Sequence, residues 1–305
     1  MRHNARQRGA VLLVLALTIS VVGLLWLYSS LAQQDSDVRT QQAISLAQSA
    51  LIGRALADVN RAGSMPCPDT NNDGASELLV GVQCPSYIGR LPWRTLGLSD
   101  MRDGAGERLW YVLSPDARDA TGNVINSSVT TGQLQINSSA QQVAIVFSPD
   151  SVVGQQSRDS TQQNAVGQYL DGSNADGDTN YESRLHDDDI FNDQVRAISQ
   201  KQLFRQVEKY ALQQFASAIQ QYDASFHTYP YAGNAAGDMQ VGQLTGYIPY
   251  TTLALASSAW AQNHWFDALS AVPYSVNAAL DTVQMQLRYC LANLRRGGVL
   301  VVQCG

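Results

Sequence analysis

The hydrophobic pattern of the chain begins with one long apolar run near the N-terminus. No charged residue occurs between Arg8 and Asp35, and residues 10–32 are rich in Leu, Val, Ile and Ala and contain no proline. A helix needs about 20 apolar residues to cross the hydrocarbon core of a bilayer. The run therefore predicts a transmembrane helix. The arginines before it (Arg2, Arg6 and Arg8) favour a cytoplasmic N-terminus, with the rest of the chain on the far side.

Hydrophobic periodicity continues directly after this run. Steps of three and four residues separate Ile44, Ala47, Leu51, Ala55 and Val59, which is the period of a helix with one buried face. No proline interrupts the chain up to this point. We therefore expect one helix of roughly fifty residues that is apolar all round in its first half and amphipathic in its second.

Three fates are open for the apolar segment. A secretory signal peptide would be cut after Ser30-Leu31-Ala32, but its apolar region would be longer than usual. An ordinary single-pass anchor would keep Met1. A class III leader would be cut between Gly9 and Ala10, and the apolar segment would remain as the start of a long stalk helix. The continuity of the predicted helix favours the leader.

Alternating and periodic patterns after the stalk predict an α+β fold. Strands are expected at 109–113, 133–136 and 143–147, in an antiparallel sheet that lies against the stalk helix. Residues 151–186 are polar and rich in Gly, Asn and Asp, which is typical of a long loop or linker. A second helix follows, with apolar positions at Leu203, Val207, Ala211, Phe215, Ala218 and Tyr222.

The order of motifs around the first helix recurs around the second. Met65-Pro66, a Gly/Asn/Asp loop and the segment 87–93 follow the first helix; Tyr229-Pro230-Tyr231, a similar loop and the segment 246–250 follow the second. We interpret this as a degenerate internal duplication, with a chance recurrence of Pro/aromatic turns as the alternative. The expected regions are a leader peptide (1–9), the transmembrane half of the stalk helix (10–34), a first head (35–150), a polar linker with an acidic loop (151–190) and a second helix-plus-sheet head (191–305).

Charge and motif content exclude several function classes. The formal net charge is −6, and the three N-terminal arginines contribute +3 of it, so the exported part carries −9. This balance disfavours a nucleic-acid partner. The sequence contains no GxSxG, HExxH, GK[ST] P-loop or strand-to-helix GxGxxG motif. We therefore do not expect an enzyme, and no catalytic residue is assigned.

Four cysteines, Cys67, Cys84, Cys290 and Cys304, suggest disulfides in an oxidising compartment. Two local bridges, 67–84 and 290–304, are the expected pairing, although the sequence alone leaves the other pairings open. A zinc site is disfavoured because the pairs lack CxxC spacing and no histidine lies near them.

The loop after Cys67 resembles the start of a calcium-binding loop. Oxygen-bearing side chains stand at its positions 1, 3, 5 and 9, namely Asp69, Asn71, Asp73 and Glu77. Gly74 stands at position 6, but position 12 is Val80 where a calcium loop has a bidentate Glu. Calcium would be structural here, and no other cofactor is expected. An Asx-turn loop pinned by a disulfide explains the same residues, and both interpretations stay open.

A second acidic cluster lies in the polar segment. It comprises Asp171, Asp176, Asp178, Asn180, Glu182 and Asp187-Asp188-Asp189, with His186 beside it. A solvated acidic loop is the favoured interpretation over a calcium site.

Several of these stretches resemble the type II secretion pseudopilin and type IV pilin-like superfamily. They are the charge-poor helix after Arg8-Gly9, the PCPDTNNDG stretch (66–74), the GRLPWRTLGL stretch (89–98) and, more loosely, FNDQV (191–195). The resemblance implies that a prepilin peptidase cuts after Gly9 and methylates Ala10. It also implies a single-pass inner-membrane protein with a periplasmic head, which then joins a periplasmic or extracellular filament. The partners would be other pseudopilins or pilins and the inner-membrane assembly platform.

Two residues depart from the superfamily's pattern. Most members begin the mature chain with Phe, and major subunits carry Glu at the fifth mature position; this chain has Ala10 and Val14 there. The Glu is understood to neutralise a neighbour's N-terminal amine, which is costly to bury unpaired. A tip subunit has no such neighbour above it. The resemblance therefore favours a minor, tip or accessory subunit, and the alternative is a membrane-anchored periplasmic binding or adhesive module outside any filament.

Overall fold

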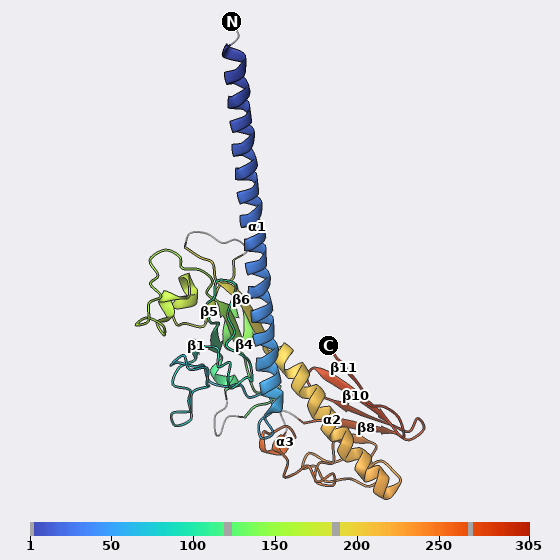
Figure 1. The fold of residues 1–305 in the computed structure, drawn as a ribbon. Helices are drawn as coiled ribbons and strands as arrows, with labels where there is room; N and C mark the ends of the chain where they lie inside the picture. The colour runs from blue at the N-terminus through green and yellow to red at the C-terminus, as the bar shows by residue number, and fades with distance from the viewer. Residues whose placement is uncertain (1–2, 119–123, 185–189, 268–270) are drawn as a thin grey trace.

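The computed structural model describes residues 3–118, 124–184, 190–267 and 271–305 and has the expected α+β architecture. A 55-residue helix, α1 (His3–Ala57), extends alone from the molecule in its first half. One sheet lies along one side of its second half, and helix α2 with a second sheet starts on the other side at the C-terminal end of α1 and extends beyond it (Figure 1). The long continuous N-terminal helix that the periodicity predicts is confirmed.

The amphipathic half of α1 buries the predicted stripe. Ile44, Ala47, Leu51 and Ala55 are almost completely buried in the main core. Val59, the last residue of the predicted stripe, is instead 80% exposed, and this part of the prediction is wrong. The helix ends at Ala57 because the Asp58 carboxylate accepts hydrogen bonds from the next backbone N–H groups, those of residues 60 and 61, which offers an alternative to further helical turns.

The first sheet contains six strands, of which the long β4 (Ser139–Ser148) is the central one. β4 pairs antiparallel with β2 (Trp110–Leu113), β3 (Leu134–Ile136) and β6 (Gln194–Ser199). β1 (Ile88–Arg90) pairs antiparallel with β2, and β5 (Asn180–Tyr181) pairs parallel with β3. The three predicted strands are therefore present as β2, β3 and β4, and α1 packs on β4 and β6.

The polar segment after β4 covers the other face of this sheet. Its short 3₁₀ turns are η2 (Val166–Gln168) and η3 (Gly172–Ala175); the turn η1 (Pro115–Ala117) follows β2. Tyr169, Leu170 and Tyr181 pack in a second core with Trp110 and Phe147. The segment therefore contributes side chains to a core, which a linker would not do. These side chains are few and irregularly spaced, so the sequence shows no hydrophobic period here. The sequence had also assigned β6 to the second head, whereas it pairs within the first sheet.

The second unit is a helix on a five-stranded antiparallel sheet. The helix α2 (Gln200–Phe226) begins at Ser199, whose hydroxyl accepts a hydrogen bond from the N–H of residue 202. The strands follow the order β11-β10-β9-β8-β7, with bounds β7 (Thr245–Tyr247), β8 (Pro273–Asn277), β9 (Thr282–Gln286), β10 (Cys290–Arg295) and β11 (Val301–Cys304). A short helix, α3 (Ala259–Gln262), precedes β8.

Helix α2 joins the two units into one continuous core. It contacts α1, β4 and β6 on one side and β10 and β11 on the other. Leu203, Phe204 and Phe215 are completely buried in the same cluster as Ile44 of α1 and Met285 of β9. The two sheets are therefore not separated by solvent along this helix.

Both cysteine pairs form the expected local bridges. Cys67 and Cys84 are 17 residues apart, and Cys290 and Cys304 are 14 residues apart and face each other across β10 and β11. In the chain-entropy account, closing loops of this size stabilises the fold by about 3 kcal/mol each.

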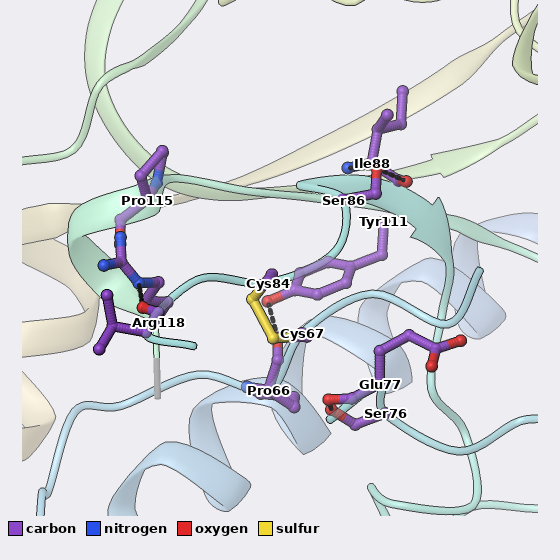
Figure 2. Close-up of a disulfide and its surroundings, with 11 residues drawn as sticks. Pro66, Cys67, Ser76, Glu77, Cys84, Ser86, Ile88, Tyr111, Pro115 and Arg118 are labelled. Carbon is purple, nitrogen blue, oxygen red and sulfur yellow. Dashed lines mark hydrogen bonds between the residues drawn. A yellow bond between two sulfur atoms is a disulfide. The ribbon is translucent and has the colours of Figure 1, made fainter. Parts of the chain in front are cut away.

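The first unit closes its turns with a specific set of hydrogen bonds. The Tyr111 hydroxyl on β2 donates to the Pro66 carbonyl at 3.2 Å, beside the Cys67–Cys84 bridge (Figure 2). The backbones of Asp69 and Arg90 exchange two N–H···O bonds, at 3.0 and 2.7 Å.

The second unit contains the corresponding contacts. The Tyr274 hydroxyl on β8 donates to the Pro230 carbonyl at 2.9 Å. The backbones of Gly233 and Tyr247 exchange two N–H···O bonds, at 2.7 and 3.0 Å. These four residues stand in the same order along the chain as their counterparts in the first unit.

A glycine against an aromatic ring also occurs in both units. Gly74 has φ +86°, and a Cβ built on it would lie 2.4 Å from the Trp93 ring; Gly237 has φ +79°, and its Cβ would lie 2.3 Å from the Tyr250 ring. A side chain is excluded at both positions by the ring and by the left-handed backbone.

The α1 stripe gives the first prediction. Leu51→Ala removes a completely buried side chain and should lower the free energy of unfolding by about 3 kcal/mol, since a cavity remains in a packed core. Leu46→Ala, on the same helix but 51% exposed, is the matched control and should change stability by less than about 0.5 kcal/mol. Thermal unfolding of the full chain in detergent micelles measures both. Equal losses would contradict the assignment of the buried face.

Candidate functional site

The first candidate site is the apolar half of α1. Within the described side chains, the helix contains one segment that is long and apolar enough to cross a membrane, with a mean hydropathy of 2.0 and no burial inside the molecule. Trp26 and Tyr28 are more than 70% exposed. Such a surface is costly in water and suits a lipid environment.

The polar side chains of this half satisfy their hydrogen bonds within the helix. Each hydroxyl donates to a carbonyl three or four residues earlier, at 2.8–2.9 Å: those of Thr18, Ser20, Ser29 and Ser30. A hydroxyl without a partner would be expensive in hydrocarbon, so these bonds make the segment compatible with a bilayer.

The predicted processing residues lie at the start of the same helix. The helical backbone runs through Gly9 and Ala10 without interruption. Val14, the fifth residue after the predicted cut, is 58% exposed on the apolar half. The expected cleavage position therefore precedes the apolar segment.

The second candidate site is the loop that starts at Asp69. Its carboxylate is buried and accepts three backbone N–H bonds: Oδ1 from residues 71 and 72, at 3.1 and 2.6 Å, and Oδ2 from Gly74 at 2.6 Å. Burial raises the pKa of Asp69 above its usual range, although these hydrogen bonds act in the opposite direction.

The remaining predicted ligands are also engaged within the loop. Oδ1 of Asn71 accepts the N–H of Asp73, whose own Oδ1 accepts the N–H of residue 75. Glu77, near the disulfide in Figure 2, accepts both the N–H and the hydroxyl of Thr70. These contacts favour the Asx-turn interpretation. Within the described ranges no group of three or more His, Cys, Asp or Glu side chains has a metal-holding arrangement, and calcium binding here stays a prediction.

The acidic cluster of the polar segment is divided by the fold. Asp171 is buried, whereas Asp176 and Asp178 are exposed and cap nearby backbone N–H groups. His186 and residues 187–189 lie outside the described residues. The sequence pattern did not distinguish the buried member from the solvated ones.

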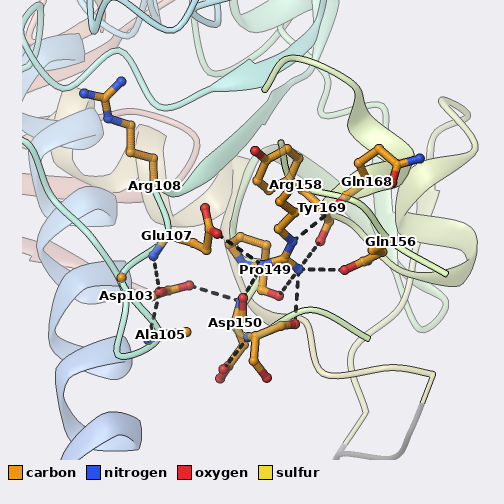
Figure 3. Close-up of polar contacts among 12 residues, drawn as sticks. Asp103, Ala105, Glu107, Arg108, Pro149, Asp150, Gln156, Arg158, Gln168 and Tyr169 are labelled. Carbon is orange, nitrogen blue, oxygen red and sulfur yellow. Dashed lines mark hydrogen bonds and ion pairs between the residues drawn. The ribbon is translucent and has the colours of Figure 1, made fainter. Parts of the chain in front are cut away.

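Arg158 organises the polar segment over the first sheet (Figure 3). Its guanidinium donates to the backbone carbonyls of Pro149, Asp150, Ser151 and Gln168 and lies 3.6 Å from the carboxylate of Glu107. The side chain is 4% exposed. One arginine thus satisfies four backbone carbonyls at the start of and within a segment whose helical structure is limited to short 3₁₀ turns.

Asp103 anchors the neighbouring loop to the same region. Its Oδ1 accepts the N–H groups of Ala105 and Glu107, and its Oδ2 accepts the N–H of Asp150 and the hydroxyl of Ser148 on β4 (Figure 3). The 103–107 turn and the start of the polar segment are therefore held together.

Arg90, inside the GRLPW stretch, was not predicted as a site residue from the sequence. Its guanidinium is stacked between two aromatic rings. The Cζ atom lies 4.3 Å from the centroid of the Trp110 ring and 3.9 Å from that of the Tyr169 ring. Burial lowers the pKa of Arg90 to about 10, so that it stays charged at neutral pH. The sequence offered one signal for its burial, namely an arginine directly before the apolar Leu91.

Two buried carboxyl groups lie close together, that of Asp171 in the polar segment and that of Asp193 just after it. Asp193 Oδ2 accepts the N–H of Asp171 and the side-chain amide of Asn174, at 2.8 and 2.9 Å. Asp193 Oδ1 is buried without a hydrogen-bond partner among the described residues. Burial and, next, the neighbouring Asp171 charge raise the pKa of Asp193 to about 8. A proton on Asp193 at neutral pH explains how two carboxyl groups share this buried position.

Comparison with known proteins covers families, curated proteins and solved structures. No known protein family, curated protein or solved structure matches the chain. The assignment of function therefore depends on the residues and contacts above.

The carboxyl pair gives a pH prediction. Between about pH 4 and pH 8 the folded state binds more protons than the unfolded state at Asp193, so the stability should fall as the pH rises through this window. Asp193→Asn should remove most of this dependence and raise stability at pH 8 by at most about 5 kcal/mol, because one pKa unit corresponds to about 1.4 kcal/mol. Melting temperatures at pH 5 and pH 8 measure the effect.

The exposed Asp176→Asn is the matched control and should leave the pH profile unchanged. A wild-type profile that is flat between pH 5 and pH 8 would show that Asp193 is ionised in the folded protein.

Proposed function

We propose that the chain is a pseudopilin-like minor subunit, at the tip or in an accessory position, of a type II secretion or type IV pilus-type filament. Its leader would be removed between Gly9 and Ala10 by a prepilin peptidase. The observation that supports this most is α1: one uninterrupted helix is apolar and exposed at its start and buried in the head at its end.

The continuity of α1 argues against a cleaved secretory signal peptide. A cut after Ala32 would fall in the middle of a regular helix, eight residues before the buried Thr40. A cut after Gly9 keeps the whole apolar segment attached to the head. Before assembly this segment would hold the protein in the inner membrane with the head in the periplasm, and afterwards it would pack among the helices of other subunits.

Val14 supports a position at the tip. The apolar side chain at this point offers no carboxylate for the N-terminal amine of a subunit above it, and an amine buried without a partner is costly. A tip subunit needs no such carboxylate. Partners would therefore be other pseudopilins or pilins below it and the inner-membrane assembly platform.

We also infer that the second unit is a degenerate copy of the first head. The support is the recurrence of three contacts in the same chain order: a Tyr hydroxyl on a Pro carbonyl, a backbone pair that closes the loop, and a Gly against an aromatic ring. The copy has no apolar extension, because α2 begins at a Ser199 cap. Two heads on one stalk make a broad end, which suits a tip better than a repeated position along a filament.

The alternative function is a membrane-anchored periplasmic binding or adhesive module that never enters a filament. It would use the same anchor and the same head, but it would keep its leader. The N-terminus of the mature protein therefore distinguishes the two functions.

Mass spectrometry of the native N-terminus tests the proposal. N-methylated Ala10 is the expected result, and Gly9→Val should block cleavage because a side chain is introduced next to the cut bond. Gly23→Val is the matched control: a Cβ at this position meets no atom within 4 Å, and processing should be normal.

A native chain that begins with Met1 would favour the anchored module, and one that begins with Gln33 would contradict both functions.

A further inference from the structure

A polar cavity of about 320 Å³ lies in the first head between the loop 100–108 and the polar segment. Four arginines line it, namely Arg90, Arg102, Arg108 and Arg158, together with the acidic residues Glu107 and Asp159. Neither the stalk helix nor the duplicated turns explain this concentration of positive charge.

Arg90 is the most unusual member of the cavity wall. The residue is 3% exposed, and its two terminal nitrogens donate to neutral backbone carbonyls, those of Arg108 at 3.0 Å and Gln163 at 2.7 Å. Its Nε is buried and has no hydrogen-bond partner among the described residues. The aromatic rings on its two faces offset part of the desolvation cost. A buried guanidinium held only by neutral groups still favours an anion beside it.

The neighbouring arginines have donors left for a ligand. One carboxylate, that of Asp100, accepts two bonds from Arg108, at 2.7 and 3.0 Å, and one from Arg102 at 3.0 Å. Arg108 also donates to the backbone carbonyl and the side-chain oxygen of Asn72, at 2.7 and 2.8 Å, which leaves one of its N–H groups for a ligand. Arg102 otherwise donates to the Gly106 carbonyl, and its side chain is 48% exposed. Arg158, in contrast, is occupied by carbonyls and by Glu107.

The charge of the cavity is close to balanced but remains positive. Four arginines, Glu107 and Asp159 line the cavity, and Asp100 pairs with two of the arginines, so that these seven side chains carry a surplus of one positive charge. Asp69 lines a second cavity of about 200 Å³ that shares Arg90 with the first, and its carboxylate is held by three backbone N–H groups.

We propose that this cavity binds a carboxylate ligand, with the guanidinium groups of Arg90, Arg102 and Arg108 as its donors. A planar carboxylate matches the fork of a guanidinium, and its single charge matches the surplus. A phosphate dianion would exceed the surplus and face the acidic side of the cavity. The volume lies at the lower end of the range for small-ligand pockets, which suits a short carboxylic acid or one acidic side chain of a partner chain.

Isothermal titration calorimetry on the full chain in detergent micelles tests this proposal. Four probes are used at equal ionic strength: sodium propionate, the blocked peptide acetyl-Ala-Glu-Ala-amide, sodium phosphate and sodium chloride. Saturable binding of propionate or of the peptide, each of which carries one carboxylate, is expected, with none for phosphate or chloride. Binding of propionate alone would indicate a free carboxylic acid, and binding of the peptide alone a partner chain; either outcome supports a carboxylate site.

Variants connect binding to the cavity. Arg102→Gln removes a half-exposed donor and should weaken the binding of the carboxylate by about tenfold, because charge-assisted hydrogen bonds are lost. Arg295→Gln, an exposed arginine of β10, is the matched control and should bind as the native chain does. The melting temperature of each variant without ligand verifies that it is folded.

Three results would overturn the proposal: no saturable binding of either carboxylate, equal affinity in Arg102→Gln, or tighter binding of phosphate. The proposal does not depend on cleavage at Gly9, so it stands or fails separately from the filament function.

Discussion

The packing of one face of α1 is the constraint on which the remaining structure depends. The same helix must be apolar all round where it leaves the head and apolar on one stripe where it enters it. The stripe packs on β4 and β6 and contacts α2, so it fixes the position of both units. Because the helix is continuous, the orientation of the head relative to the proposed membrane segment is set by helix geometry rather than by a flexible linker.

The first head depends on buried charge as much as on apolar packing. The polar segment 151–186, which has few apolar side chains, covers one face of the sheet, and arginine side chains donate hydrogen bonds to its backbone carbonyls. Arg158 binds the segment to the 103–107 loop, and Arg90 is enclosed between aromatic rings contributed by β2 and the segment. Polar contacts hold the segment on this face of the sheet, whereas a hydrophobic stripe holds α1 on the opposite face.

Periodic patterns predicted the elements that are long or regularly alternating. The α1 stripe, strands β2 to β4 and the helix α2 each bury a repeated set of side chains, and both disulfides follow from local cysteine pairs. Strands β1, β5 and β6 are short or follow polar residues, so their pairing with distant partners leaves no local signal. The burial of Arg90 and Asp193 could not be predicted either, since it results from tertiary contacts of a segment with a solvated composition.

Helix α2 connects the two heads rigidly, because it packs on both of them. Its first turns contact the second sheet as well, since Arg205 donates to the Cys304 carbonyl of β11 and Glu208 accepts the N–H of Tyr289 beside β10, and α2, α1 and both sheets share one core. The second head therefore cannot swing as an independent domain without breaking this core. A load applied to the strands near the C-terminus would pass through the first turns of α2 into the base of α1, so the molecule would act as one rigid body and not as two modules on a hinge.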